Sequence, residues 1–167
     1  MNDDIESICS SVKFIGFDFD GVFTDNIVYT SQDGNEYVAC WRSDGLGLSK
    51  LKKTGIPIWV ISTEKNPVVK KRCEKLEINC LQGCDDKLTA LERLLKEYDC
   101  KLSEAAFVGN DINDVACLEN VGLPIVVADA HPDIQHLAKY KTRTLGGKGA
   151  VREVCDLISG YHLSDTR

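Results

Sequence analysis

The sequence lacks several features that would place it in large classes of proteins. Its apolar runs fall short of the roughly 18–20 residues that span a bilayer, which argues against a membrane-spanning helix. Residues 1–4 lack the basic-then-apolar form of a signal peptide, so we expect a cytoplasmic protein. Lys and Arg number 20 against 26 Asp and Glu, which argues against a broad nucleic-acid-binding face. Without repeats, low-complexity tracts or Pro/Gly-rich linkers, the 167 residues are interpreted as one domain, 1–167.

The eight cysteines include no Cys-x-x-Cys pair. The closest two, Cys80 and Cys84, lack the second pair or nearby histidines of a zinc site. A disulfide framework suits small secreted chains, and no secretion signal is visible here. We therefore predict mostly reduced, buried cysteines that act as small apolar residues. His131, His136 and His162 are not spaced as a metal set, and His131 is interpreted as structural.

The sequence does contain short apolar runs that alternate with amphipathic stretches. The apolar runs predict strands at residues 12–17, 57–61, 78–81, 105–108 and 124–127. Helices are predicted at residues 44–53, 67–76, 87–98, 113–119 and 149–159. The turn signal Ser31–Gly34 predicts a β-hairpin over about 22–41. This alternation predicts an α/β fold with a doubly wound, mostly parallel sheet, in which ligands bind at the carboxyl ends of the strands.

The first predicted strand ends in two carboxylates, Asp18 and Asp20, followed by Gly21. Two residues apart on an extended segment, both side chains face the same side, and the glycine allows a sharp turn. Near a shared cation, one carboxylate can act as a nucleophile and the other as a general acid and base. A solvated turn is the simpler alternative, but a buried strand directly before the pair favours a function.

Polar residues also follow the next strands. Ser62 and Thr63 come before a helix and suit a phosphate ligand, although a plain helix start explains them equally well. Lys87 could neutralise a phosphoryl group, or be a solvated surface lysine. The Gly109–Asp114 loop is rich in oxygen ligands and suits Mg²⁺ better than a simple helix cap. Because the sheet gathers these strand ends into one crevice, the set predicts phosphoryl transfer through an aspartyl-phosphate.

The ordered set resembles the haloacid dehalogenase superfamily of phosphohydrolases over essentially residues 13–158. The segments Phe17–Asp25, Arg42–Gly45, Ala128–Pro132 and Gly146–Glu153 are similar to its small capless branch, which acts on sugar-acid phosphates. The resemblance implies a HAD-like Rossmannoid fold and a Mg²⁺-dependent phosphatase acting on a 2-keto-3-deoxy sugar acid phosphate. Its implied pathways are sialic-acid-type or lipopolysaccharide sugar synthesis.

The resemblance also implies a role for each matching residue. Asp18 would be the nucleophile, Asp20 the acid and base, and Ser62 and Lys87 the phosphoryl ligands. The implied metal-site residues are Asp18, Asp20, Asn110, Asp111 and Asp114. The candidates for substrate binding are Thr24, Thr63, Glu64, Arg72, Lys75 and Lys148.

Two departures from the family pattern carry information. Asn110 stands where the branch often has Asp, so the sequence leaves open whether Asn110 or Asp111 is the direct ligand and predicts weaker metal binding or slower turnover. Glu64 with Lys75 is similar to the nonulosonate 9-phosphate enzymes and favours a nine-carbon over an eight-carbon (octulosonate 8-phosphate) substrate. Lys75 would lie about 12 Å along its helix, which suggests action across a subunit interface or no role in the site.

The chain has no room for a cap domain between Asp18 and Lys87. An open phosphoryl-transfer site loses electrostatic strength and specificity, so something else must cover it. The apolar hairpin 22–41 is a candidate, and the resemblance implies a homotetramer in which a neighbour's hairpin or C-terminal segment closes each site. Lys148 and Arg152 are then candidates for a substrate carboxylate.

Two alternatives remain. A signalling receiver domain has a similar fold, but its phosphorylated Asp ends the third strand, where this sequence has Gln82–Cys84. A weakly active or non-catalytic tetramerisation module associated with a sialic-acid cytidylyltransferase fits the amide at Asn110, although the intact Asp18 and Asp20 count against it.

Overall fold

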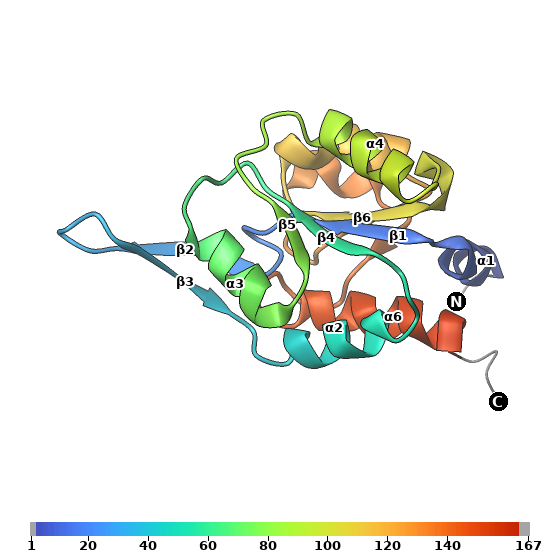
Figure 1. Ribbon diagram of the computed structural model, residues 1–167, viewed down its shortest axis with the longest axis horizontal. Coiled ribbons are helices and arrows are strands. Elements are labelled where there is room, and N and C mark those ends of the chain that lie inside the picture. Colours follow the sequence, from blue (N-terminus) through green and yellow to red (C-terminus); the bar gives the residue numbers. More distant parts are fainter. Residues whose placement is uncertain (1–2, 164–167) are drawn as a thin grey trace.

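The computed structural model describes residues 3–163 and contains one six-stranded sheet (Figure 1). Its strand order is β5-β4-β1-β6-β7-β8, and every neighbouring pair is parallel. The strands are β1 (Phe14–Phe17), β4 (Ile58–Ile61), β5 (Asn79–Leu81), β6 (Ala105–Gly109), β7 (Leu123–Val126) and β8 (Tyr140–Lys141). The chain adds β4 and then β5 on one side of β1, and it then returns to add β6, β7 and β8 on the other side, as in a doubly wound fold. The predicted fold class is confirmed.

Helices cover both faces of this sheet. They are α1 (Asp3–Ser11), α2 (Asp44–Lys52), α3 (Val68–Leu76), α4 (Lys87–Glu97), α5 (Val115–Asn120) and α6 (Ala150–Leu163). In Figure 1, α4 lies above the sheet and α2 and α6 lie below it. Helix α2 packs extensively on α6, α5 packs against α4, and α3 lies along β5.

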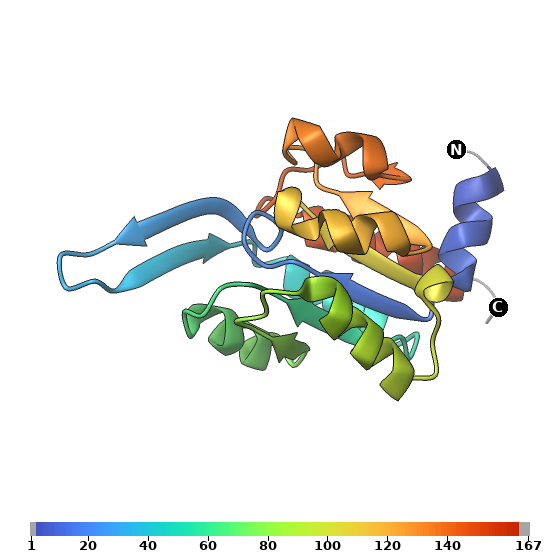
Figure 2. The same cartoon turned by 90° about the horizontal axis from the view of Figure 1, so that it is seen from above.

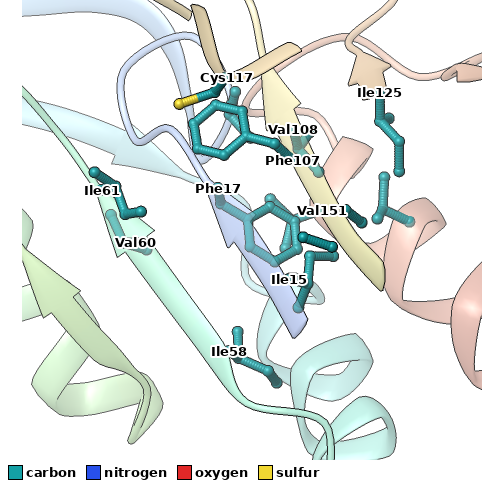
Figure 3. Packing of buried hydrophobic residues seen from close by; sticks show 14 of the residues in the cluster. Ile15, Phe17, Ile58, Val60, Ile61, Phe107, Val108, Cys117, Ile125 and Val151 are labelled. Atoms are coloured by element: carbon teal, nitrogen blue, oxygen red, sulfur yellow. The ribbon is translucent and has the colours of Figure 1, made fainter. Parts of the chain in front are cut away.

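The core explains why the central strands are apolar throughout. All residues of β1 and β6 are buried, because helices cover both sides of these strands. Figure 3 shows Ile15 and Phe17 beside Val151 of α6, and Phe107 beside Cys117 of α5. Gly16 is required at this point, because a Cβ there would come within 2.8 Å of the Phe107 ring.

The predicted hairpin is present and projects away from the sheet (Figure 2). Strands β2 (Thr24–Thr30) and β3 (Glu36–Cys40) pair in antiparallel fashion around the turn at residues 31–35. From Thr24 to Val28 the chain takes four steps while the facing strand takes two, from Cys40 to Val38, so β2 carries a bulge. The hairpin therefore bends where it leaves the sheet.

Several elements differ from the sequence-based expectation. Helix α1 and strand β8 were not predicted, and α6 continues to Leu163. Short 3₁₀ turns occupy η1 (Leu102–Glu104), η2 (Ile112–Asp114) and η3 (Pro132–Leu137), so the helix expected at 113–119 begins as η2 and continues as α5. Residues 1–2 and 164–167 lie outside the described residues. These residues include both ends of the predicted domain 1–167 and part of the C-terminal segment that is expected to close a neighbour's site.

All eight cysteines fall within the described residues and are free thiols, and four of them (Cys9, Cys73, Cys117 and Cys155) are buried. Between residues 3 and 163, no helix has both the length and the apolar character needed to cross a membrane.

Candidate active site

The predicted site residues gather where β1, β4 and β6 end, next to the base of the hairpin. The Asp18 amide donates to the Val108 carbonyl of β6 (2.8 Å), and the Ser62 amide donates to the Leu81 carbonyl of β5 (2.9 Å). Sheet hydrogen bonding thus continues past each strand end and fixes these residues side by side. A cavity of about 290 Å³ opens there, lined by Asp18, Asp20, Asn26, Ser62, Thr63, Asn110, Asp111, Ile112 and Asn113. We call it the phosphate cavity.

A buried lysine joins two aspartates beneath the phosphate cavity. Lys87 Nζ lies 2.8 Å from Asp18 Oδ1 and 2.7 Å from Asp114 Oδ1, and all three side chains are at most 5% exposed. Asp18 Oδ1 also accepts a hydrogen bond from the Phe19 amide (2.7 Å). These two donors fix the orientation of the Asp18 carboxylate, the group that would act as the nucleophile.

The electrostatics of Asp18 reflect opposing neighbours. Burial and the negative charge of Asp114 raise the pKa of Asp18 to about 7, against the opposing effect of Lys87. Burial, followed by the charge of Glu64, raises the pKa of Asp20. A raised pKa suits Asp20 to the general-acid role, since that role requires a proton on the carboxyl group.

Asp114 acts within the loop after β6. Its Oδ1 faces Lys87, and its Oδ2 accepts hydrogen bonds from the amides of Asn110 (2.9 Å) and Asp111 (3.3 Å). Asp111 Oδ1 accepts from the amide of Ile112 (2.7 Å). The structure therefore uses Asp114 to hold the loop and Lys87 in place, and both of its oxygens face these partners.

Three oxygen-bearing groups meet at the other side of Asp18. One polar atom of the Asn110 carboxamide lies 2.9 Å from the Asp20 carbonyl oxygen and 3.2 Å from Asp18 Oδ2. If this atom is nitrogen it donates to both oxygens, whereas with oxygen in the same place three oxygens converge. Neighbouring ligands of octahedral Mg²⁺, with bonds of about 2.0–2.1 Å, are about 2.9 Å apart. The separations therefore fit a Mg²⁺ site formed by Asp18, the Asp20 carbonyl and Asn110.

Local backbone geometry makes this arrangement possible. Gly21 has φ +78°, and a Cβ at this position would collide with the Asn110 carboxamide. Among residues 3–163, no three His, Cys, Asp or Glu side chains form a metal-binding group. The candidate site is of a different kind, since it combines one carboxylate with a backbone carbonyl and an amide.

A second cavity, of about 260 Å³, lies between the hairpin and the loop after β4. It is lined by Asp20, Asn26, Ile27, Val28, Glu36, Val38, Glu64, Asn66 and Val68. Glu64 Oε1 accepts from the amides of Lys65 and Asn66 (both 2.7 Å), and the Asn66 carboxamide donates to Glu36 Oε2 (3.0 Å). Since Asp20 lines both cavities, this one lies where the group leaving a phosphate would sit, and we call it the leaving-group cavity.

Other predicted substrate residues lie elsewhere. Buried Thr24 accepts from the amides of Gly21 (3.1 Å) and Asn26 (3.2 Å) and shapes the turn. Arg72 Nη2 donates to the Trp41 carbonyl (3.4 Å), and Lys148 pairs with Asp25 (3.0 Å). Lys75 is exposed in the last turn of α3. Arg72, Lys75 and Lys148 line neither cavity, so their substrate roles stay predictions.

Sequence reasoning missed Asn26, Glu36 and Asn66 as cavity residues. The hairpin was predicted, but the bulge that turns Asn26 toward the phosphate cavity has no sequence signature.

The chain is similar to known hydrolases. Residues 74–153 match the family model of haloacid dehalogenase-like hydrolases. The 3-deoxy-D-manno-octulosonate 8-phosphate phosphatase of Yersinia pestis is 38% identical over 157 residues, which cover 93% of this chain and 84% of that protein.

Comparison with solved structures gives the same family. The structure of the Yersinia pestis phosphatase has a TM-score of 0.93 and 36% identity, and the match covers 97% of this chain and 88% of the other. The same phosphatase from Moraxella catarrhalis, in complex with magnesium, phosphate and KDO, has a TM-score of 0.92 and 32% identity, covering 100% of both chains. These relatives confirm the predicted enzyme class, a phosphatase, and its magnesium cofactor. The chain therefore belongs to the haloacid dehalogenase-like hydrolases, the superfamily that its strand-end motifs resembled.

Proposed function

We propose that this chain hydrolyses the phosphate ester of a 2-keto-3-deoxy sugar acid through an aspartyl-phosphate. The observation that carries the proposal is the buried Asp18–Lys87–Asp114 set, which fixes the Asp18 carboxylate at the phosphate cavity. The charge of Lys87 favours the ionised form of Asp18 against the effect of burial, and it lies where the transferring group gains negative charge. Bound by Asp18, the Asp20 carbonyl and Asn110, Mg²⁺ would supply further positive charge for the phosphoryl oxygens.

The chemistry proceeds in two displacements at phosphorus. One oxygen of the Asp18 carboxylate forms a bond to phosphorus as the ester P–O bond breaks, and the leaving oxygen takes a proton from Asp20. Asp20, now a carboxylate, then accepts a proton from a water molecule whose oxygen attacks the phosphorus of the aspartyl-phosphate. The bond between Asp18 and phosphorus breaks as the water oxygen bonds to phosphorus. Inorganic phosphate then leaves, Asp18 is again a carboxylate, and Asp20 again carries its proton. Ser62, which is 1% exposed, is the proposed hydrogen-bond donor to the phosphoryl group.

The relatives support the substrate class. The relatives and the leaving-group cavity both bear on the number of carbons in the substrate. The names of the relatives support the eight-carbon octulosonate 8-phosphate. Glu64 is the residue that favours a nine-carbon nonulosonate 9-phosphate, and it does line this cavity. Its expected companion, Lys75, is exposed outside the cavity, which weakens that preference within one subunit.

A homotetramer is part of the proposal, with a neighbour's hairpin or C-terminal segment over each site. Its support is the projecting hairpin, on which Val28, Tyr29 and Tyr37 are 50%, 63% and 61% exposed. The cytoplasmic location stays a prediction.

The deciding experiment measures phosphate release in Mg²⁺ from octulosonate 8-phosphate and from a nonulosonate 9-phosphate. Asp18→Asn keeps the shape of the side chain but lacks the nucleophilic carboxylate, so we expect a loss of at least about 1,000-fold. A preference for the nine-carbon ester would support the interpretation of Glu64. A folded wild-type tetramer that releases no phosphate from either ester would contradict the proposal and favour the assembly module.

A further inference from the structure

Asn26 occupies an unusual place between the two cavities. It lines the phosphate cavity with Ser62 and Asn110, and it lines the leaving-group cavity with Glu36 and Glu64. Asp20 lines both cavities as well. A residue in that position faces the part of a bound ester where the phosphoryl group joins the leaving group.

The backbone of Asn26 is held in a conformation that few side chains adopt. Its φ is +62°, in the left-handed region, where Asn is among the few tolerated residues other than Gly. The β2 bulge creates this geometry, and Thr24 Oγ1 accepts the Asn26 amide hydrogen (3.2 Å). Such backbone geometry has a free-energy cost, and glycine would avoid it, so a side chain here is retained against local preference.

The chemistry around Asn26 selects a class of leaving group. The leaving-group cavity has the carboxylates of Glu36 and Glu64 and the carboxamide of Asn66, and no Lys, Arg or His lines it. Within residues 3–163, the hydrogen bond formed by Asn26 comes from its backbone, so its carboxamide remains available as donor and acceptor. Carboxylates and carboxamides pair well with hydroxyl groups, and the two carboxylates repel a further anionic group in this cavity.

We propose that Asn26 binds the hydroxyl group on the carbon next to the scissile ester and is a specificity-determining residue of this enzyme. The proposal rests on the proposed function, and it narrows the substrate to esters whose first carbons carry hydroxyls. The substrate carboxylate then lies away from the ester, beyond the carboxylates of Glu36 and Glu64.

The test measures binding separately from turnover. In an Asp18→Asn background with Mg²⁺ present, ³¹P NMR titration gives the Kd of glycerol 1-phosphate and of n-propyl phosphate, which differ only in two hydroxyls. We expect glycerol 1-phosphate to bind at least about tenfold more tightly, as loss of hydrogen bonds in a site built for them predicts. Adding Asn26→Gly, which suits the positive φ, should bring the ratio of the two Kd values close to one.

Asn35→Gly is the matched control. It removes the same carboxamide from the same hairpin at the turn, outside both cavities, so the Kd ratio should stay unchanged. A ratio that Asn26→Gly leaves intact, or equal weakening of both ligands, would overturn the role of Asn26. Failure of the proposed function has a different signature, namely no phosphate release by the wild-type chain while the Kd ratio still depends on Asn26.

Discussion

At the scale of single residues, Asn110 is the departure that most affects the metal site. In the proposed Mg²⁺ site, its amide would supply an oxygen ligand without a negative charge, beside Asp18 and the Asp20 carbonyl. Divalent-cation affinity depends on the number of charged ligands, so a neutral ligand weakens binding. The Asn110 amide also removes a like-charge contact with Asp18 when no cation is bound, which stabilises the metal-free protein.

Asn110→Asp should therefore increase the affinity for Mg²⁺. We expect the Mg²⁺ concentration that gives half-maximal phosphate release to fall about tenfold, equivalent to about 1.4 kcal/mol of binding free energy. The melting temperature without Mg²⁺ should fall, because two carboxylates then face each other. Asn113→Asp adds the same charge to an exposed position of the same loop and serves as control. Equal shifts in the two variants would show that general loop charge, and not ligation, is responsible.

Asp44, away from the active site, has its own pH dependence. Its side chain is fully buried at the start of α2, where Oδ1 accepts from the Arg152 amide (3.1 Å) and Oδ2 has no hydrogen-bond partner among the described residues. Burial raises the pKa of Asp44 to about 6. Since the folded pKa lies above the unfolded one, the folded state favours the proton, and this stabilisation is complete below about pH 4 and lost as pH rises through about 6.

Asp44→Asn should remove that loss. At pH 8 the variant should be more stable than the wild type by up to about 3 kcal/mol, the free energy that corresponds to the pKa shift. At pH 3, where Asp44 is mostly protonated in both states, the difference should largely disappear. Urea denaturation at the two pH values measures it. A difference of the same size at both pH values would contradict a titration origin and indicate a change in packing.

At the scale of elements, the sequence predicted the central strands and the helices that cover them because each has a clear hydrophobic pattern. Strands β1 and β6 are continuous apolar runs, and α4 is amphipathic. Helix α1 was not predicted although Ile5, Ile8, Cys9 and Val12 follow helical spacing, because a helix of nine residues shows this period over little more than two turns. Strand β8 has two residues, too few for any period to be visible.

The site was predictable to the extent that it consists of strand ends. Asp18, Ser62 and Lys87 follow apolar runs, and the topology of the sheet brings them together. Contacts between distant loops left no such signal. The sequence left open whether Asn110 or Asp111 is the direct metal ligand, since the partners of each side chain depend on how the loop after β6 folds.

The Gly146–Gly147 segment shows the same limit. The spacing of its glycines does not match that of a phosphate-binding loop. The structure places the segment against the turn that follows Asp18 and Asp20. The Gly147 amide donates to the Val22 carbonyl (3.0 Å), and the Gly146 amide donates to Asp129 Oδ1 (2.8 Å). A Cβ at Gly146 would collide with the Gly21 carbonyl oxygen. The glycines therefore allow this segment to support the start of the hairpin.

At the scale of the whole molecule, the projecting hairpin is the feature that a monomer does not explain. Tyr29 and Tyr37 are directly paired across β2 and β3, and both are more than 60% exposed. An isolated two-stranded hairpin is marginally stable in water, and a contiguous apolar surface of this kind usually marks an interface. Packing of hairpins between copies would bury the apolar side chains and place a neighbour close to each leaving-group cavity.

Replacing both tyrosines by lysine should break the proposed tetramer. In Tyr29→Lys/Tyr37→Lys, each hairpin would bring two positive charges to the surface where copies meet, so we expect the mass from size-exclusion light scattering to fall from tetramer to a smaller species. Leu46→Lys, at an apolar α2 position that is 67% exposed, tests whether loss of any exposed apolar side chain has this effect.

Because the strand ends of the sheet form the phosphate cavity within one chain, the smaller species should still bind inorganic phosphate. A wild-type monomer, or a double variant that remains tetrameric, would exclude the hairpin as the surface that joins the copies.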